Sequence, residues 1–150
     1  MSYYNLIPSC STCNGFGAKA ENDILIPKNK IINPYLINSN NFNFSFQIKQ
    51  VSSKGFIEVN IKSPTCGYNN LFKLDELYKE HSDHIEELIF KSEIKYPQSY
   101  RKVIEDMFSK SQRNIDFSRF LLGNYTEDEN LHKRPLAKLY KDIAIQLNLI

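Results

Sequence analysis

The spacing of apolar residues changes once along this chain, and that change limits the folds open to it more than any other feature. Between residues 42 and 62 apolar and polar residues alternate, with Ser53-Lys54-Gly55 between two runs. Alternation is the pattern of a strand with one buried face. From about residue 71 the apolar residues recur three and four positions apart, which is the spacing of helices. We therefore predict an α+β fold, mainly helical, in which helices cover a β-hairpin.

The apolar residues of the predicted hairpin share one face of it. They are Phe42, Phe44, Phe46, Ile48, Ile57, Val59 and Ile61. Aromatic residues on a strand can form a platform on which nucleic-acid bases stack. Because the phenylalanines alternate strictly beside a matching strand, we instead assign them to the core.

About four helices are expected after the hairpin. The first starts near residue 71, and the second starts at Pro97, since proline is favoured at the first helical position. A short third helix is predicted between an Asp116 cap and Gly123-Asn124, and the last runs from Pro135 nearly to the end. The residues expected on the inner helix faces are Leu74, Leu77, Tyr78, His81, Ile85, Leu88, Ile89, Tyr100, Val103, Ile104, Met107, Phe108, Phe117, Phe120, Leu121, Leu136, Leu139, Tyr140, Ile143, Ala144 and Leu147.

Composition adds bounds on the class of protein. The chain has 150 residues, of which 41% are hydrophobic and 24% charged, so it can bury a core as one compact domain. It lacks a run of about 18 apolar residues, and its start has no basic segment leading into an apolar one, so we expect no membrane span and a cytoplasmic location. A net charge of +2 does not by itself indicate nucleic-acid binding.

Three cysteines, Cys10, Cys13 and Cys66, favour metal binding over a disulfide framework, because their number is odd and the first two have C-x-x-C spacing. Two thiolates at that spacing can bind one tetrahedral zinc ion, although two ligands alone bind it weakly. A redox dithiol is the alternative, but it normally follows a strand of a βαβ unit, which is not predicted here. Cys66 could supply a third ligand, yet a lone cysteine is more often a small packed residue.

The residues around the close cysteine pair sharpen this interpretation. They read Asn5-Leu6-Ile7-Pro8-Ser9-Cys10-Ser11-Thr12-Cys13-Asn14 and continue into Gly15-Phe16-Gly17-Ala18-Lys19. This stretch resembles the second half of the HNH, or ββα-metal, nuclease motif, in which Asn-Leu precedes the cysteine pair and His or Asn follows it.

The resemblance implies a role for each matching residue. Asn5 would be the middle asparagine that fixes the loop bearing the general base, and Asn14 would be the terminal residue beside the catalytic metal. Cys10 and Cys13 would form half of a structural zinc site. In the family a histidine takes the proton of the attacking water while one divalent ion stabilises the charge on the phosphate, so the complete nuclease would use Mg²⁺ or another divalent ion.

The resemblance continues through most of the chain. The stretches Ile32-Asn33-Pro34-Tyr35-Leu36, Phe72-Lys73-Leu74-Asp75-Glu76-Leu77-Tyr78-Lys79-Glu80-His81 and Lys133-Arg134-Pro135-Leu136-Ala137-Lys138-Leu139 look like the C-terminal extension of bacterial HNH proteins, including some associated with anti-phage defence. Residues 1–41 would then be the C-terminal half of the HNH motif with its zinc knuckle. Residues 42–150 would be the hairpin and the helical extension.

The chain departs from the family pattern at the general base. The first C-x-x-C and the Asp-His pair lie upstream of the middle asparagine in the family, and only four residues precede Asn5 here. His81, His84 and His132 lie on or beside predicted helices, not on a first strand. We therefore expect a C-terminal fragment or subunit of a DNA nuclease that is inactive alone, with DNA and a separate N-terminal half as partners. The alternative is a non-catalytic zinc-knuckle module that binds a partner ATPase or nucleic acid.

Two further groups of side chains have both a functional and an ordinary interpretation. Basic residues could contact DNA phosphates, or could simply be solvated; they are Lys19, Lys133, Arg134, Lys138 and Lys141, of which the last two are expected on the exposed side of the final helix. His81 and His84 form an H-x-x-H pair, whose spacing can bind a metal on a helix. Because His81 falls on the apolar stripe, we interpret it as a packed histidine.

Overall fold

A computed structural model describes residues 31, 33, 36, 38, 40–51, 54–62, 67, 69, 72–110 and 116–150. Its strands are β1 (Asn43–Val51) and β2 (Lys54–Lys62). Its helices are α3 (Leu74–Lys79), α4 (Ser82–Phe90), the π-helical η4 (Lys91–Lys95), α5 (Gln98–Ser109), α6 (Phe117–Leu122), the 3₁₀ helix η5 (Asp128–Lys133) and α7 (Ala137–Gln146). The predicted α+β, mainly helical class is confirmed. The stretch that matches the HNH motif, residues 5–19, lies outside the described residues.

The hairpin forms as the alternation predicts. β1 and β2 are antiparallel, with Phe44 opposite Ile61 and Phe46 opposite Val59. Phe44 and Val59 are buried, so the phenylalanines belong to the core as expected. The turn is placed differently from the prediction, since β2 already begins at Lys54.

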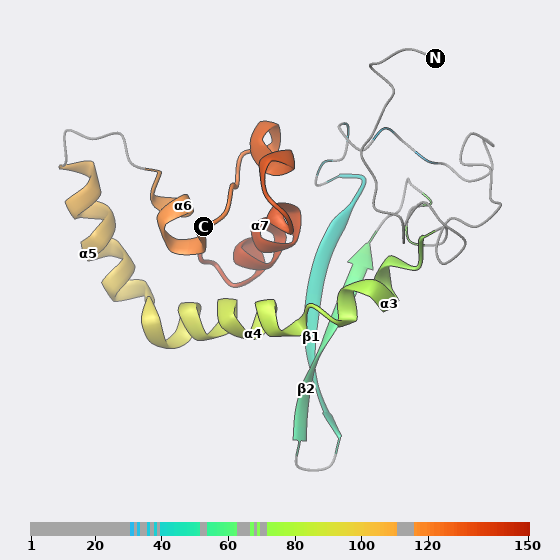
Figure 1. Cartoon of the computed structure of the whole chain (residues 1–150). Coiled ribbons are helices and arrows are strands. Elements are labelled where there is room, and N and C mark those ends of the chain that lie inside the picture. Colours follow the sequence, from blue (N-terminus) through green and yellow to red (C-terminus); the bar gives the residue numbers. More distant parts are fainter. Residues whose placement is uncertain are drawn as a thin grey trace.

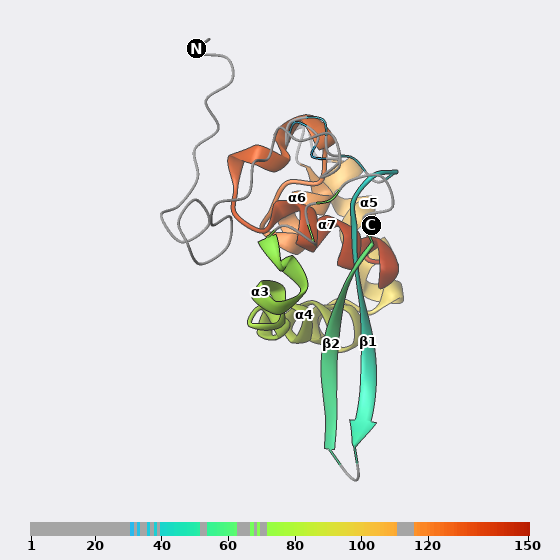
Figure 2. The same cartoon turned by 90° about the vertical axis from the view of Figure 1, so that its right-hand side faces the viewer.

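Helices cover only part of the hairpin. α7 packs on β1, whereas α3 and α4 contact β2. In both views the turn end of the hairpin projects beyond the helices (Figures 1 and 2). Ile48, on the same face as the buried phenylalanines, is 62% exposed. The apolar face therefore continues past the part that the helices cover.

The centre of the core lies where α4 meets α7. Their side chains Ile85, Leu88, Leu139 and Ile143 are the largest that are fully buried. The pair on α4 is three residues apart and the pair on α7 is four residues apart, so each helix turns one face inward. This packing positions the N-terminal end of α4 against α7.

The predicted first helix is two helices in the structure. α3 ends before Glu80, and His81 leaves helical geometry with φ −103° and ψ 20° before α4 begins. Leu77, which one continuous stripe would bury, is 45% exposed. The junction between α3 and α4 therefore replaces the single helix that the apolar spacing predicted.

The predicted start of α5 at Pro97 is one residue early, and the predicted burial of its apolar face was wrong. The helix begins at Gln98, directly after Pro97. Tyr100, Val103 and Met107 were expected inside but are 51%, 55% and 68% exposed. α5 rises from the end of α4 that is far from the hairpin, so it does not reach the sheet (Figure 1).

Residues at the helix ends explain where α6 begins and ends and where α7 begins. The Asp116 carboxylate accepts the Arg119 backbone N–H at 3.0 Å, which is the predicted cap. Gly123 has φ 69° and ends α6 as expected. Leu136 also adopts a positive φ of 57°, so α7 begins at Ala137 rather than at Pro135. Phe120, expected inside, is 47% exposed.

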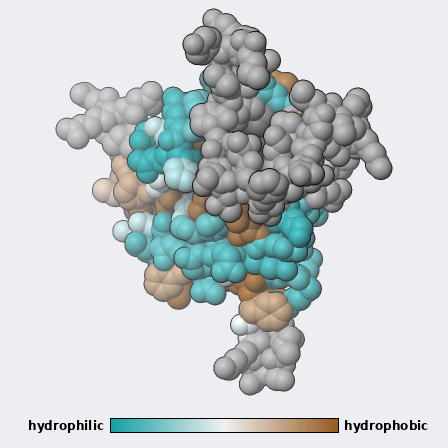
Figure 3. Space-filling model, turned by 45° about the vertical axis from the view of Figure 1, so that its right-hand side comes forward, coloured by the Kyte–Doolittle hydropathy of each residue, from teal (hydrophilic) through white to brown (hydrophobic). Residues whose placement is uncertain are grey.

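The described surface is mixed in character. The face drawn in Figure 3 is mostly hydrophilic, with smaller hydrophobic areas among the polar side chains. Among the described helices, none has both the length and the apolar character needed to cross a membrane.

Candidate functional site

The residues of the proposed HNH half-motif lie outside the described part of the chain. These are Asn5, Cys10, Cys13 and Asn14, and Lys19 and Cys66 lie outside it as well. Their roles in zinc binding, in catalysis and in contact with DNA therefore stay predictions.

Two of the basic residues proposed to contact DNA are less exposed than expected. The side chains of Lys138 and Lys141 are only 14% and 15% exposed. Lys138 Nζ donates to both carboxylate oxygens of Asp142, at 2.6 and 2.7 Å, and Lys141 Nζ lies 2.9 Å from Asp128 Oδ1. The expectation that both side chains lie on the exposed side of the last helix was wrong. Each is largely buried and forms an ion pair with a carboxylate, Lys138 with Asp142 and Lys141 with Asp128.

Lys133 and Arg134 remain exposed, as their proposed role requires. Lys133 Nζ donates to Asn130 Oδ1 at 2.6 Å and lies 5.7 Å from the centre of the Tyr125 ring. Arg134 donates to the Gly123 carbonyl at 2.7 Å. Their contact with DNA stays a prediction, and it now concerns these two residues more than Lys138 and Lys141.

A hollow between the hairpin and α7 is lined largely by groups that bind one another. The Phe44 N–H donates to Asp142 Oδ2 at 2.9 Å, and the Gln146 amide both accepts from the Phe46 N–H and donates to the Phe46 carbonyl. These bonds tie β1 to α7 across about a hundred residues of sequence. We therefore assign the hollow to the stability of the fold rather than to a ligand.

Burial and ion pairing act on Asp142 in opposite directions. Burial raises the pKa of its carboxyl, whereas the hydrogen bonds from Lys138 and Phe44 and the charges of Lys138 and Lys141 lower it. Burial is the largest of these causes, and the pKa lies above the ordinary value of 3.8. The ion pair therefore offsets the loss of solvation only in part.

We expect the wild-type chain to lose stability relative to Asp142→Asn as the pH rises above 3.8. The folded state holds the Asp142 proton more tightly than the unfolded state does. This contribution is therefore complete below the unfolded-state pKa and is lost as the pH rises through the folded-state pKa. Urea unfolding of both chains between about pH 3 and pH 7 measures the difference. A wild-type advantage that grows with pH would instead mean that the ion pair outweighs burial.

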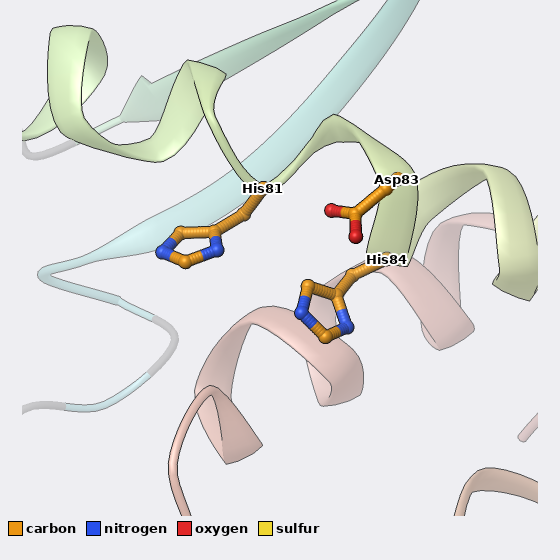
Figure 4. Close-up of side chains that lie close together, drawn as sticks. All are labelled: His81, Asp83 and His84. Atoms are coloured by element: carbon orange, nitrogen blue, oxygen red, sulfur yellow. The ribbon is translucent and has the colours of Figure 1, made fainter.

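A cluster of three side chains lies where α3 meets α4. His81 directly precedes α4, and Asp83 and His84 belong to its first turn. Each residue offers a ligand atom, and the three atoms lie within 4.8 Å of one another. Figure 4 shows the Asp83 carboxylate beside the two imidazole rings. Among the described residues, this is the group of histidine, cysteine and acidic side chains that could hold a metal ion.

His84 is held in place from α7. Its Nδ1 lies 2.7 Å from the Tyr140 hydroxyl, and the two rings meet edge to face with centres 5.6 Å apart. Burial raises the pKa of Tyr140, with smaller contributions from the negative charges of Asp83 and Glu87. The negative charges of Asp83 and Glu87 thus help to keep the proton on the Tyr140 hydroxyl, which orients His84.

The sequence indicates His81 and His84 as a possible metal-binding pair, and the structure adds Asp83 to them. The preference for a packed His81 finds some support, since its ring meets the edge of Tyr78 with centres 5.5 Å apart. Asp83 and His84 also form an Asp-His pair in the sequence, but they lie in a helix and not on a strand. The prediction that His84 lies on a helix and not on a first strand is therefore confirmed. Tyr140 could not be linked to the pair from the sequence.

The chain was compared with protein-family models, curated proteins and solved structures. It matches no protein-family model, no curated protein and no solved structure.

Proposed function

We propose that this chain is the C-terminal part of an HNH endonuclease that hydrolyses DNA phosphodiesters with a divalent metal ion. The observation that carries the proposal is the order of Asn5, Cys10, Cys13 and Asn14. Asn14 would lie beside the catalytic ion, and the two thiolates would hold half of a structural zinc site. The proposal rests on the sequence of the first residues, not on the described fold.

The proposal also assigns tasks to the rest of the chain. Lys133 and Arg134 are exposed at the start of the segment that leads into α7, where their charges can meet DNA phosphates. In this proposal the first half of the motif would supply the general base, because the three histidines of the given sequence lie on or beside helices. Without that half the chain binds metal and DNA incompletely and does not cut.

The first test adds the half that the proposal requires. A segment carrying a C-x-x-C and an Asp-His pair in HNH order is fused upstream of Asn5, and plasmid cleavage is followed with Mg²⁺ or Mn²⁺. We expect cleavage by the fusion and none by the chain alone, because only the fusion contains a general base. Asn14→Ala should abolish cleavage, whereas Asn40→Ala, at an exposed position outside the matched stretch, should leave it unchanged. A folded fusion that does not cut, or cleavage by the chain alone that Asn14→Ala abolishes, contradicts this proposal.

A second candidate function is a non-catalytic interaction module that holds a partner ATPase or nucleic acid. It is favoured by the exposed apolar side chains of α5, where Tyr100, Val103 and Met107 are each more than half exposed. Exposed apolar side chains on one helix are a common feature of protein-binding surfaces. This function predicts tight binding of a partner by the chain alone, reduced by Met107→Glu but not by Asn14→Ala. The nuclease proposal predicts instead that Asn14→Ala abolishes the activity of the fusion and that Met107→Glu does not.

A further inference from the structure

We propose that His81, Asp83 and His84 bind one divalent transition-metal ion, with Zn²⁺ as the first candidate. The site would lie at the junction of α3 and α4. It shares no residue with the proposed zinc knuckle, Cys10 and Cys13. It does not depend on the HNH proposal. Two imidazoles and one carboxylate would supply three ligands, and water would complete the coordination.

The donor atoms select the class of ion. Imidazole nitrogen is a preferred ligand of Zn²⁺, Cu²⁺, Ni²⁺ and Fe²⁺, whereas Ca²⁺ and Mg²⁺ prefer an all-oxygen environment. His81 and His84 supply nitrogen, and Asp83 supplies oxygen. Three protein ligands with an open position are also the pattern of zinc sites that keep a bound water.

The backbone brings the ligands together over four residues. His81 has φ −103° and ψ 20°, outside helical geometry, while Asp83 and His84 lie in the first turn of α4. The break at His81 lets its ring approach a residue three positions on, as Figure 4 shows. The ligand atoms are within 4.8 Å of one another, so small side-chain rotations bring them to about 2.0–2.2 Å from a common ion. Asp83 is exposed and can make that rotation freely.

Tyr140 supplies the support that ligating histidines usually have. A metal-bound imidazole commonly uses its second nitrogen in a hydrogen bond, which fixes the ring and its tautomer. Tyr140 occupies Nδ1 of His84 at 2.7 Å and therefore leaves Nε2 for the ion. In the bound state Nδ1 would carry the proton and donate to the Tyr140 oxygen. Because Tyr140 lies on α7, the site is held by the core packing of α4 against α7.

Electrostatics at this place are compatible with a cation. The N-terminal end of a helix carries a partial positive charge, which disfavours a bound cation. The carboxylate of Asp83 opposes that effect, and in the described part of the chain no ion pair uses Asp83. Glu87 adds a second negative charge near Tyr140. The direct bonds to two nitrogens and one oxygen outweigh the remaining helix effect.

The test measures binding of Zn²⁺ and Co²⁺ to the full chain in which all three cysteines are changed to serine, so that the proposed knuckle cannot contribute. Isothermal titration calorimetry should give one site per chain, and bound Co²⁺ should show the absorption of a protein-ligated ion. His81→Ala and His84→Ala should each remove it, and Asp83→Asn should weaken it. Tyr140→Phe should weaken it by about 10–100-fold, as expected when the hydrogen bond that orients a ligand is lost.

His132→Ala is the matched control, because His132 is exposed on η5 and lies outside the cluster. It should bind Zn²⁺ like the parent chain. Circular dichroism checks that each variant folds. If His84→Ala does not fold, the result for His81→Ala decides the test, because His81 is half-buried and lies outside the core. Binding that is absent from the cysteine-free chain, or that survives His81→Ala, contradicts the proposal. Either result leaves the nuclease proposal unaffected, since that proposal depends on Cys10, Cys13 and Asn14.

Discussion

Ile143→Ala is expected to lower the free energy of unfolding by about 2–5 kcal/mol, as large-to-small changes at buried aliphatic positions do. Ile143 is fully buried on α7, within the core that α7 forms with β1 and α4. The change removes apolar contacts and leaves a cavity that the surrounding side chains fill only in part. Urea unfolding followed by circular dichroism measures the loss.

Ile145→Ala is the matched control for this prediction. Ile145 lies two residues further along α7 but is 49% exposed. The same chemical change there removes few contacts, and alanine favours a helix, so stability should change by less than about 0.5 kcal/mol. Equal losses in the two variants would mean that the face of α7 turned to the core is not the one described.

The elements that the sequence predicted well are those specified by neighbouring residues. Alternation from Phe42 onward located the hairpin, because side chains on successive strand positions point to opposite faces. The Asp116 cap and Gly123 bounded α6, since each acts on backbone groups within a few residues of itself. These features require no knowledge of the rest of the fold.

The elements that it predicted poorly depend on distant parts of the chain. Apolar spacing on α5 predicted an inner face, but burial of Val103 and Met107 requires another element to lie there. Within the described residues they are instead more than half exposed. The spacing also ran through Glu80 and His81 without a sign of the break between α3 and α4. Periodicity thus reports which side of a helix is apolar, and not whether that side is covered.

The candidate metal site was predictable only in part for the same reason. His81 and His84 are three residues apart, so their pairing could be read directly from the sequence. The bond between His84 and Tyr140 joins residues that are 56 positions apart. The packing of α4 on α7 brings His84 and Tyr140 together. The hydrogen bond between them orients the His84 ring for binding a metal ion, and this orientation could not be predicted from the sequence.

Asp142→Ala is expected to lower the free energy of unfolding at neutral pH by about 3–5 kcal/mol, because it breaks a buried ion pair from one side. Asp142 is 5% exposed and accepts hydrogen bonds from Lys138 Nζ and from the Phe44 N–H. The alanine variant leaves a nearly buried ammonium group and a backbone N–H of β1 without that acceptor.

The comparison with Asp128→Ala separates burial from ion pairing as the source of this loss. Asp128 also binds a lysine on α7, Lys141, at 2.9 Å, but its carboxylate is 55% exposed. Water replaces it at the lysine, so the loss should stay below about 1 kcal/mol. Urea unfolding of both variants gives the two values. A small loss in Asp142→Ala would mean that Lys138 reaches solvent once its partner is gone, and that apolar packing and the hydrogen bonds between Gln146 and Phe46 hold α7 on β1.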